Sequence, residues 1–560
     1  MRPIDFAIIG GGCSGTYVAW RLANKYPNKS IRLYEASDRI GGRLATIEMP
    51  GTKALTGQSV RVELGGMRFS KAQLLVRHLI GHLGLHPKPF SYPISHYYLR
   101  GKHYYASDSE IPPYSVDGEE QGKDPGELVK SAIVGALKAT DLIGSDHPSV
   151  RAKLEDIRKT GSLHYSTLTP FEWEALKRVG TIADTPLWNL GFWNVLWRQL
   201  SSEAYFLAHD GLGYQSILTN WNAAEAIPWF LRDFDCSYET VQEGMDSIPL
   251  TLAAELKRAQ PHSIFTAHKA TSIEQVGDKV LRIKFTTDEE PEVVDATSVI
   301  LALPRNALQG IEFAGFSEEL VHRFQQDVST VSSHALLKLI LGYKSAWWRS
   351  DAKKRFEHTR AVTDLPIRQI YYFDSETLMA QAASVSESPV GILMASYSDA
   401  HYVDFWQPLI RKPYQDDVHY VGGDLSFDET KWLGAFGAIK RLVDKAHRQV
   451  CALHPGADPP APYVGMVMDW SLPPYLGGWH TWQTSVRPWR VMERMKNPFT
   501  KLYVCGEAYS PEQGWVEGAL RSAELVLNYM GVSPPDWVPE TAYLEQQFSG
   551  YEEYVGAKAP

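Results

Sequence analysis

The sequence predicts a mixed α/β fold in which a Rossmann-type domain is interleaved with a β-sheet domain and a helical insertion. Three observations support this prediction: a β-α-β pattern at the N-terminus, a mostly helical stretch over residues 113–225, and β-rich segments that return after it. The chain has 560 residues. This length suffices for two or three domains of about 100–200 residues each.

The N-terminal unit begins with an apolar run at residues 4–9 that ends in three consecutive glycines. Residues 14–25 then carry apolar side chains at helical spacing, and residues 31–34 form a second short apolar run. We therefore expect a strand, a helix and a second strand in close succession.

A helical region is expected to follow a polar loop at residues 108–127. The tetrapeptides that begin at Asp124 and Thr169 both have the pattern of a capping box with proline at the first helical position. Residues 192–206 show the periodicity of one further helix.

Apolar segments after the helical region predict strands at residues 280–286, 298–303, 336–341, 367–373 and 391–397. The chain closes with a predicted strand at 502–505, a glycine-rich turn and a predicted helix at 517–529.

Composition narrows the classes of protein that fit. The net charge of −9 argues against a nucleic-acid surface, and the sequence has no run of 18 apolar residues that would span a membrane. The four cysteines are scattered without zinc spacing, so we expect reduced thiols and no metal site. Because the first strand begins at Ile4, we expect no secretory signal and a cytoplasmic protein, with secretion of a processed form as the alternative.

Three glycines form a nucleotide-binding pattern between the first strand and helix. Gly10 permits a tight turn, Gly12 lets the backbone approach a pyrophosphate, and Gly15 lets the helix pack against the sheet. The helix N-terminus then faces the phosphates. Glu35 stands twenty residues after the last glycine, where an acid accepts from ribose hydroxyls.

The segment that follows, residues 38–43, resembles the signature of the flavin amine oxidase superfamily. In that superfamily the second arginine, here Arg43, reaches the FAD pyrophosphate. Arginine suits phosphate because its planar fork makes paired hydrogen bonds. The resemblance implies FAD rather than NAD, and we also expect Ala36 to contact the cofactor.

Residues 63–69 resemble the stretch of L-amino-acid oxidases whose arginine clamps the substrate carboxylate. The resemblance implies that Gly66 and Met67 contact the flavin, because glycine allows close approach to a flat ring. It also implies that Arg68 contacts both cofactor and substrate, and a bidentate arginine suits a carboxylate. The alternative is that Arg68 serves a structural ion pair.

Residues 506–519 are similar to the closing motif of flavin amine oxidases. The resemblance implies that Glu507 contacts the ribityl–pyrophosphate region and that the Gly514 carbonyl accepts from the substrate amine. Trp515 and Val516 are expected beside the flavin. The helix that starts near Glu517 points its positive end toward the ring edge where negative charge develops on reduction.

Two further matches imply catalytic roles. Lys338 corresponds to the lysine that holds a water at flavin N5 and favours oxygen reactivity, with a solvent-facing lysine as the alternative. Tyr371 and Tyr397 match strand positions that face the substrate, where Tyr397 shares the carboxylate with Arg68. The alternative for both tyrosines is ordinary strand packing.

The remaining matches concern tryptophans and the mode of flavin attachment. Trp470 corresponds to a position beside the flavin, and Trp479 to one beside the substrate side chain. Covalent relatives use a cysteine near this turn, whereas residues 477–480 contain none. The resemblance therefore implies non-covalent FAD.

Together these features predict an FAD-dependent L-amino-acid oxidase that takes a hydride from the α-carbon and yields a 2-oxo acid, ammonia and hydrogen peroxide. The alternatives are an L-amino-acid 2-monooxygenase, an amine or polyamine oxidase, and a flavin-binding protein without turnover. Expected partners are an L-amino acid, oxygen and further copies of the chain, but no nucleic acid or membrane.

The expected division has three domains. We assign residues 1–70, 235–330 and 465–535 to FAD binding, 71–112 and 331–464 to substrate binding, and 113–234 to the helical domain.

Overall fold

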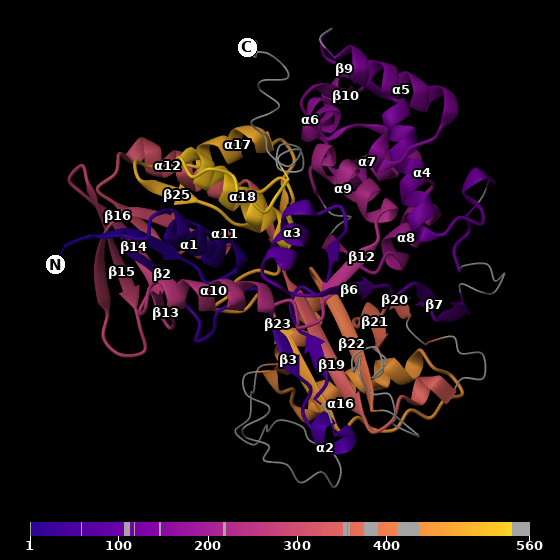
Figure 1. Cartoon of the computed structure of the whole chain (residues 1–560). Coiled ribbons are helices and arrows are strands. Elements are labelled where there is room, and N and C mark those ends of the chain that lie inside the picture. The colour runs from indigo at the N-terminus through magenta and orange to yellow at the C-terminus, as the bar shows by residue number, and fades with distance from the viewer. Residues whose placement is uncertain are drawn as a thin grey trace.

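A computed structural model describes residues 2–57, 59–105, 113–116, 118–144, 147–216, 220–350, 356, 359–373, 390–410 and 436–539. In this part of the chain, an eight-stranded sheet, a seven-stranded sheet and a helical region adjoin one another (Figure 1). Residues from all three line a large cavity. The mixed α/β class predicted from the sequence is confirmed.

The eight-stranded sheet draws its strands from three separate parts of the chain. Its order is β13 (Ile264–Phe265), β2 (Ile31–Tyr34), β1 (Ile4–Ile9), β16 (Glu292–Leu301), β15 (Val280–Thr286), β14 (Lys269–Val276) and β17 (Glu312–Ala314), with β25 (Leu502–Val504) on β16. The strand β1 pairs in parallel with β2 and β16, and its apolar residues are covered on both faces, as expected of a parallel strand.

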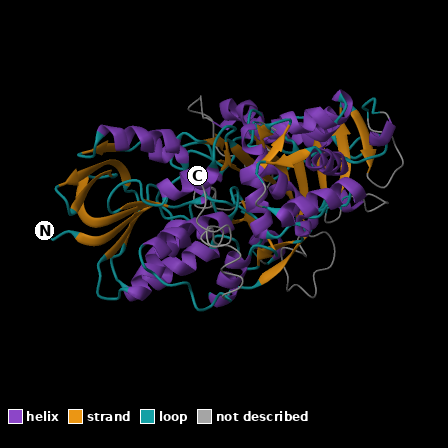
Figure 2. Cartoon of the chain, turned by 90° about the horizontal axis from the view of Figure 1, so that it is seen from above, coloured by secondary structure: helices purple, strands orange, loops and turns teal. Residues whose placement is uncertain are grey.

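Helices cover both faces of this sheet. On one face α1 (Cys13–Lys25) packs against α10 (Ser247–Ala259) and α18 (Val516–Tyr529). On the other face lie α12 (Glu318–Val328) and α17 (Pro488–Met495). Figure 2 shows this layering around the strands nearest the N-terminus.

The seven-stranded sheet is antiparallel except where β20 meets β7. Its order is β23 (Val464–Asp469), β19 (Leu336–Tyr343), β22 (Gly391–Asp399), β21 (Gln369–Phe373), β20 (Arg360–Thr363), β7 (Ile94–Leu99) and β8 (Lys102–Tyr105). Two helices, α14 (Tyr402–Ile410) and α16 (Lys440–Ala452), pack against it. The register pairs Lys338 with Tyr397, so both side chains leave the sheet on the same face.

The helical region contains α4 (Pro125–Lys138), α5 (Pro148–Thr160), α6 (Pro170–Val179), α7 (Phe192–Gln199), α8 (Ser202–Gly211) and α9 (Ala223–Asp235). A small sheet of β9 (Thr140–Leu142), β10 (Gly180–Ile182) and β11 (Thr185–Pro186) joins them. Both predicted capping boxes are confirmed: Asp124 and Thr169 accept from the third backbone N–H of their helices.

Short elements connect these parts. They are β3 (Thr46–Glu48), α2 (Thr52–Thr56), β4 (Arg61–Glu63), β5 (Phe69–Ser70), α3 (Leu74–His82), β6 (Pro87–Phe90), η1 (Gly118–Glu120), η2 (Tyr165–Thr167), η3 (Leu187–Asn189), β12 (Tyr238–Val241), α11 (Arg305–Gln309), β18 (Val331–His334), η5 (Trp347–Ser350), β24 (Trp479–Trp482) and η7 (Glu507–Tyr509). The strands β6 and β12 lie where the three parts meet (Figure 1).

Three predicted elements differ from the structure. The single helix expected at 192–206 is wrong: Leu200 is extended and the Ser201 side chain caps a second helix, α8. The strand expected from residue 367 starts at Gln369, because Arg368 has a φ of 55° that a strand cannot hold. The strand expected from residue 298 starts earlier, at Glu292, where it pairs with β15.

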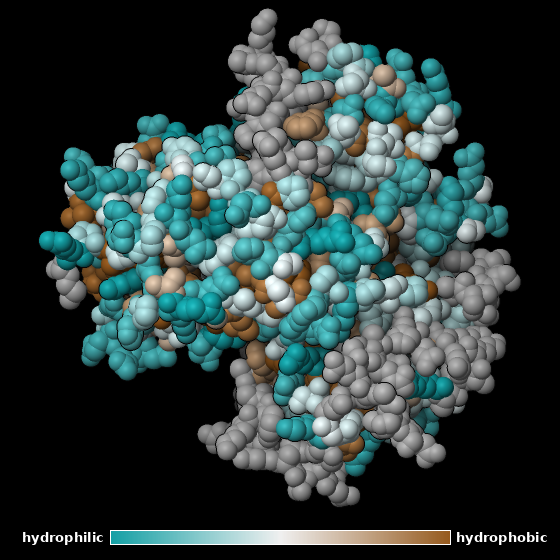
Figure 3. Space-filling model, in the orientation of Figure 1, coloured by the Kyte–Doolittle hydropathy of each residue, from teal (hydrophilic) through white to brown (hydrophobic). Residues whose placement is uncertain are grey.

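Other expectations from the sequence have no direct test in the fold. Residues 106–112 and 117 of the predicted loop lie outside the described residues, and the domain boundaries stay a prediction. Every helix in the described part is too short or too polar to cross a membrane. All four cysteines carry free thiols. Figure 3 shows a mainly hydrophilic face interrupted by small hydrophobic patches.

Candidate active site

A continuous cavity of about 1560 Å³ extends from the glycine-rich turn to the helical region. Its walls come from both large sheets and from the helices. Pockets for one small molecule are typically about 300–1,000 Å³. The cavity therefore has room for a cofactor and a substrate together.

The glycine-rich turn forms one end of this cavity. A side chain at Gly10 would overlap the Ala302 carbonyl, and one at Gly15 would overlap the Gly10 carbonyl. By contrast, the only atom near a side chain added at Gly12 would be the Gly42 Cα, 3.7 Å away, and Gly12 faces the cavity. Because Gly12 caps α1 without a side chain, the first N–H groups of α1 are free to bind an anion.

Glu35 follows β2 and is fixed as an acceptor in the cavity wall. Its Oε2 accepts from the Gly11 amide at 2.6 Å, and its Oε1 accepts from the amide and hydroxyl of Ser37 at 2.9 and 2.8 Å. Ala36 lines the wall beside it. These contacts hold the carboxylate rigidly, as recognition of a ribose hydroxyl requires.

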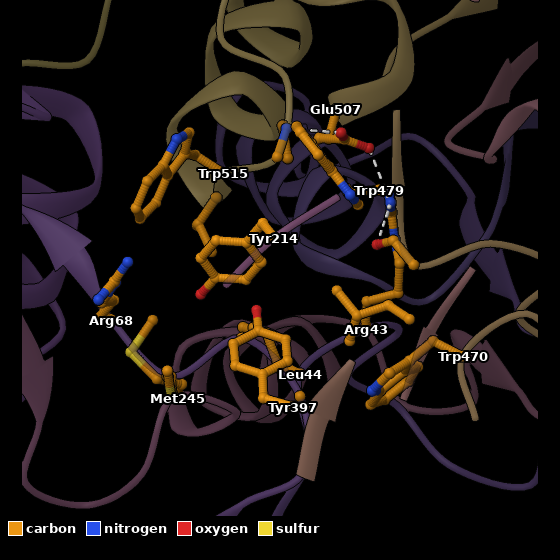
Figure 4. Close-up of a pocket in the computed structure, with 18 of the residues that line it drawn as sticks. Arg43, Leu44, Arg68, Tyr214, Met245, Tyr397, Trp470, Trp479, Glu507 and Trp515 are labelled. Atoms are coloured by element: carbon orange, nitrogen blue, oxygen red, sulfur yellow. Dashed lines mark hydrogen bonds and ion pairs between the residues drawn. The ribbon is translucent and has the colours of Figure 1, made fainter. Parts of the chain in front are cut away.

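Arg43 and Glu507 form an ion pair in the middle of the cavity (Figure 4). Arg43 donates to Glu507 Oε2 at 2.7 Å and to the Gly478 carbonyl at 3.1 Å. The Gly514 amide donates to Glu507 Oε1 at 2.6 Å, and His480 Nδ1 lies 2.9 Å from Oε2. Burial would raise the pKa of Glu507, but Arg43 and His480 outweigh it and hold the pKa well below its usual value.

Lys338 lies behind the turn that carries Gly66 and Met67. Its Nζ donates to the backbone carbonyls of Gly65 and Glu63 and lies 4.9 Å from the centre of the Tyr397 ring. Burial lowers the pKa of Lys338 although the Glu63 carboxylate opposes this. Because the side chain is 1% exposed, the alternative of a solvent-facing lysine is wrong.

The opposite end of the cavity contains Arg68 and a cluster of aromatic rings. The Arg68 guanidinium stacks 4.1 Å from the centre of the Tyr238 ring. Tyr397 and Tyr214 are hydrogen-bonded and meet edge to face at 5.2 Å. Burial raises the pKa of Tyr397 to about 12, which keeps its hydroxyl protonated at neutral pH. Figure 4 shows Arg68, Tyr214, Tyr397 and Trp515 around the same space.

Arg68 forms no ion pair with any residue in the described part of the chain. The alternative role of Arg68 in a structural ion pair therefore finds no partner there. A guanidinium that lines a cavity in this way is available to an anionic ligand.

Most of the residues that the sequence singled out line this cavity. They are Gly10, Gly12, Glu35, Ala36, Arg43, Gly66, Met67, Arg68, Tyr397, Trp470, Trp479, Glu507, Gly514, Trp515 and Val516. Gly15 instead packs α1 against β1, and Lys338 lies behind the wall. Tyr371 is fully buried one layer back, with its hydroxyl 3.5 Å from Gln369 Oε1.

The loop of residues 213–216 contributes Tyr214, which sequence reasoning missed. The buried Asp399 at the end of β22 accepts from the amides of Gln215 and Ser216 at 2.9 and 3.0 Å, and from the Ser216 hydroxyl. The same hydroxyl accepts from Trp479 Nε1 at 3.2 Å. Asp399 thus holds Tyr214 and Trp479 in place from beneath the cavity wall.

Two charged residues of the cavity wall were also missed. Asp233 at the end of α9 accepts from the Tyr238 hydroxyl, and Arg360 at the start of β20 donates to Gln369 Oε1 at 2.7 Å. No motif surrounds either residue, so neither could be recognised from the sequence.

The wall fits FAD in three respects. The uncapped start of α1 suits the pyrophosphate, Glu35 suits the ribose, and Gly65 and Gly66 let their turn pack closely on residues 43–45 where it lines the cavity beside the space for a flat ring. The paired charges of Arg43 and Glu507 between these groups suit the polar chain that joins ring and phosphate.

Comparisons with known proteins agree with this geometry. The model of the flavin containing amine oxidoreductase family matches residues 14–526. Achacin from Lissachatina fulica is 26% identical over 94% of this chain and 92% of its own length. L-amino acid oxidase Bs29 from Bothriechis schlegelii is 22% identical over 93% of this chain and 89% of its own.

Among solved structures, a wild-type putrescine oxidase bound to putrescine is similar with a TM-score of 0.60 at 16% identity. The match covers 94% of this chain and 99% of that one, and it shows a shared fold. The chain therefore belongs to the flavin-containing amine oxidoreductase family, and its cofactor is FAD.

Proposed function

We propose that the chain is an L-amino-acid oxidase. The observation that carries this proposal is the Arg68 guanidinium, which lines the substrate end of the cavity and forms no direct ion pair in the described part of the chain. The carboxylate of Asp233 acts on it only at longer range. A simple amine has no group for this cation to bind, whereas the α-carboxylate of an amino acid does.

In this proposal Arg68 and the protonated Tyr397 hydroxyl hold the α-carboxylate. The Gly514 carbonyl accepts from the amine, and Trp515 closes the site on the side of α18. These contacts fix the orientation of the α-carbon, which is the positioning contribution to catalysis. The walls exclude water from the reacting atoms.

The bound flavin supplies the redox chemistry, by accepting a hydride from carbon and passing the two electrons to oxygen. The substrate loses the α-hydrogen with two electrons, and an amine proton, to give an imino acid. Water then converts the imino acid to a 2-oxo acid and ammonia, while oxygen takes up two electrons and two protons to form hydrogen peroxide. We assign oxygen reactivity to Lys338, whose Nζ retains one N–H after its two backbone contacts.

The direct test mixes the purified yellow protein with each L-amino acid without air and follows the flavin absorbance. We expect bleaching with L- but not D-amino acids, followed on admission of air by equal amounts of peroxide and 2-oxo acid. Amide and carbon dioxide would instead indicate a 2-monooxygenase, and bleaching only by simple amines an amine oxidase. Absence of bleaching with all of these would indicate a flavin-binding protein without turnover.

Replacement of the carboxylate clamp gives a sharper test. We expect Arg68→Met to lower kcat/KM by roughly 30- to 5,000-fold, because loss of one partner of a buried charge pair costs about 2–5 kcal/mol. Arg77→Met, on the nearby α3 and half-exposed, is the matched control and should leave kcat/KM unchanged. Equal activity of the two variants would remove Arg68 from the substrate site.

Three further expectations concern the attachment of FAD, the oligomeric state and the location of the protein. FAD should be released intact when the protein is denatured, since we propose non-covalent binding. A homo-oligomer is expected and is measured by light scattering on the eluting protein. A cytoplasmic location stays a prediction, to be checked by fractionation of the source cells.

A further inference from the structure

A second guanidinium lines the substrate end of the cavity. Arg360 opens β20 and donates to the neutral amide oxygen of Gln369 at 2.7 Å. Its guanidinium lies 5.9 Å from the centre of the Tyr371 ring. Within the described residues neither Arg360 nor Arg68 forms a direct ion pair, although the carboxylate of Asp233 acts on both guanidinium groups at longer range.

The two arginines flank the same part of the cavity. Tyr214 and Asp233 both line the wall, and the charges of Arg68 and Arg360 act on both of them. Burial raises the pKa of Asp233, although Arg68 and Arg360 oppose that shift. Tyr214 and Asp233 are therefore within electrostatic reach of both Arg68 and Arg360.

The charge of Arg360 also acts on Tyr97. Tyr97 lines the cavity together with residues 121–124, most of which are exposed. A substrate that enters from this side and places its α-carboxylate at Arg68 extends its side chain back toward Arg360.

Charge complementarity decides which side chain fits best. In the proposed binding mode the α-carboxylate pairs with Arg68, and Arg360 is left to contact the side chain. A side chain that ends in a carboxylate supplies an anion to Arg360. A neutral side chain leaves Arg360 without this anion, and a basic side chain adds a further positive charge, which is costly in a buried site.

We propose that this end of the cavity selects L-amino acids whose side chain ends in a carboxylate, with Arg360 as the side-chain contact. This inference rests on the proposed function, since it assigns the α-carboxylate to Arg68. The aromatic walls, including Phe90 and Phe230, pack against the methylene groups of such a side chain.

A binding test that needs no turnover uses two acids without an amine, glutarate and pentanoate. They have the same number of carbons, but only glutarate carries the second carboxylate. We expect the flavin absorbance of the holoenzyme to report glutarate binding about 10- to 150-fold tighter, the worth of one charge-assisted hydrogen bond. Arg360→Met should abolish this difference and leave pentanoate binding unchanged.

Matched variants distinguish a contact from a general effect on the fold. Arg100→Met removes a half-exposed arginine from the loop after β7 and should preserve the glutarate preference. Asp233→Asn keeps an acceptor for the Tyr238 hydroxyl while it removes the negative charge, so glutarate binding should tighten. Weaker glutarate binding in Asp233→Asn would contradict the proposed charge complementarity.

Turnover provides the second readout. We expect kcat/KM for L-glutamate to exceed that for L-leucine and L-lysine, and Arg360→Met to lower it about 10- to 150-fold for L-glutamate alone. Reduction of the flavin by neutral or basic amino acids in preference to L-glutamate would overturn this inference while the oxidase function stands. Suppose instead that glutarate binds selectively but no L-amino acid reduces the flavin. This result would overturn the proposed function, while the inference of a dicarboxylate-binding site would stand.

Discussion

The two ends of the cavity differ in whether their charged side chains are paired within the protein. At the cofactor end, Glu507 is paired with Arg43 and His480, and Glu35 is held by three hydrogen bonds. At the substrate end, Arg68 and Arg360 have no ion pair among the described residues. The first end is internally neutralised and can hold a cofactor permanently. In our proposal the charges of the second end are kept for a substrate that binds and leaves.

The largest effect on stability and FAD content should follow from removal of Glu507, the acceptor of the network at the cofactor end. Glu507→Ala leaves Arg43 and His480 buried without their carboxylate and the Gly514 amide without its acceptor. We expect the free energy of unfolding to fall by about 3–5 kcal/mol and most FAD to be lost. Urea unfolding and the ratio of flavin to protein absorbance measure both.

The control for this variant is Glu493→Ala, which removes the exposed partner of Lys496 on α17 and should cost less than about 1 kcal/mol. A Glu507→Ala protein with full flavin content and unchanged stability would show that the cofactor end does not depend on this network.

The pH dependence of stability tests the same comparison at Glu517, a buried glutamate outside the Arg43 network. Glu517 accepts from the amides of Leu75 and Val76, and burial together with Glu512 raises its pKa to about 7. Between about pH 4.5 and 7 the folded chain retains a proton that the unfolded chain has released. Stability from this group is therefore lost as the pH rises through that window, by up to about 3 kcal/mol.

Glu517→Gln should remove this dependence. We expect the wild type to lose stability relative to Glu517→Gln between pH 4.5 and 7.5, as followed by urea unfolding at each pH. Parallel stability curves for the two proteins would mean that Glu517 is ionised in the folded chain throughout.

The smallest effect should come from a change at Asp399, which holds the wall at the substrate end in place. Asp399→Asn weakens the hold on the loop of Tyr214 and on the Ser216 hydroxyl that contacts Trp479. We expect kcat/KM to fall about 10- to 150-fold, as for the loss of a charged hydrogen bond, with full FAD content. Asp364→Asn, an exposed acceptor for the Arg100 amide, is the control. Loss of FAD in Asp399→Asn would show that the two ends are not separate.

The same contrast explains what the sequence could predict. The cofactor end depends on turns in which neighbouring residues act together, so Gly10, Glu35, Arg43 and Glu507 stand in recognisable patterns. Most strands could also be predicted, because their apolar runs are continuous in the sequence. The helix break at Ser201 was missed because a capping serine within an amphipathic stretch does not interrupt its periodicity.

The residues of the substrate end could not be predicted together from sequence patterns in this way. Asp233 ends a helix, Arg360 starts a strand, and Tyr214 sits on a loop held by Asp399. Each is an ordinary residue in its own segment, and only the pairing of distant elements makes the group functional. The predicted Tyr371 shows the reverse case, since it lies behind the cavity wall rather than on it.

The ion pair between Arg43 and Glu507 joins residues that are 464 positions apart. During synthesis at about 5–20 residues per second, Arg43 emerges many seconds before its partner exists. Until Glu507 has been synthesised, Arg43 lacks this carboxylate. Because we expect FAD to be lost without Glu507, we also expect cofactor loading to wait until translation has passed β25.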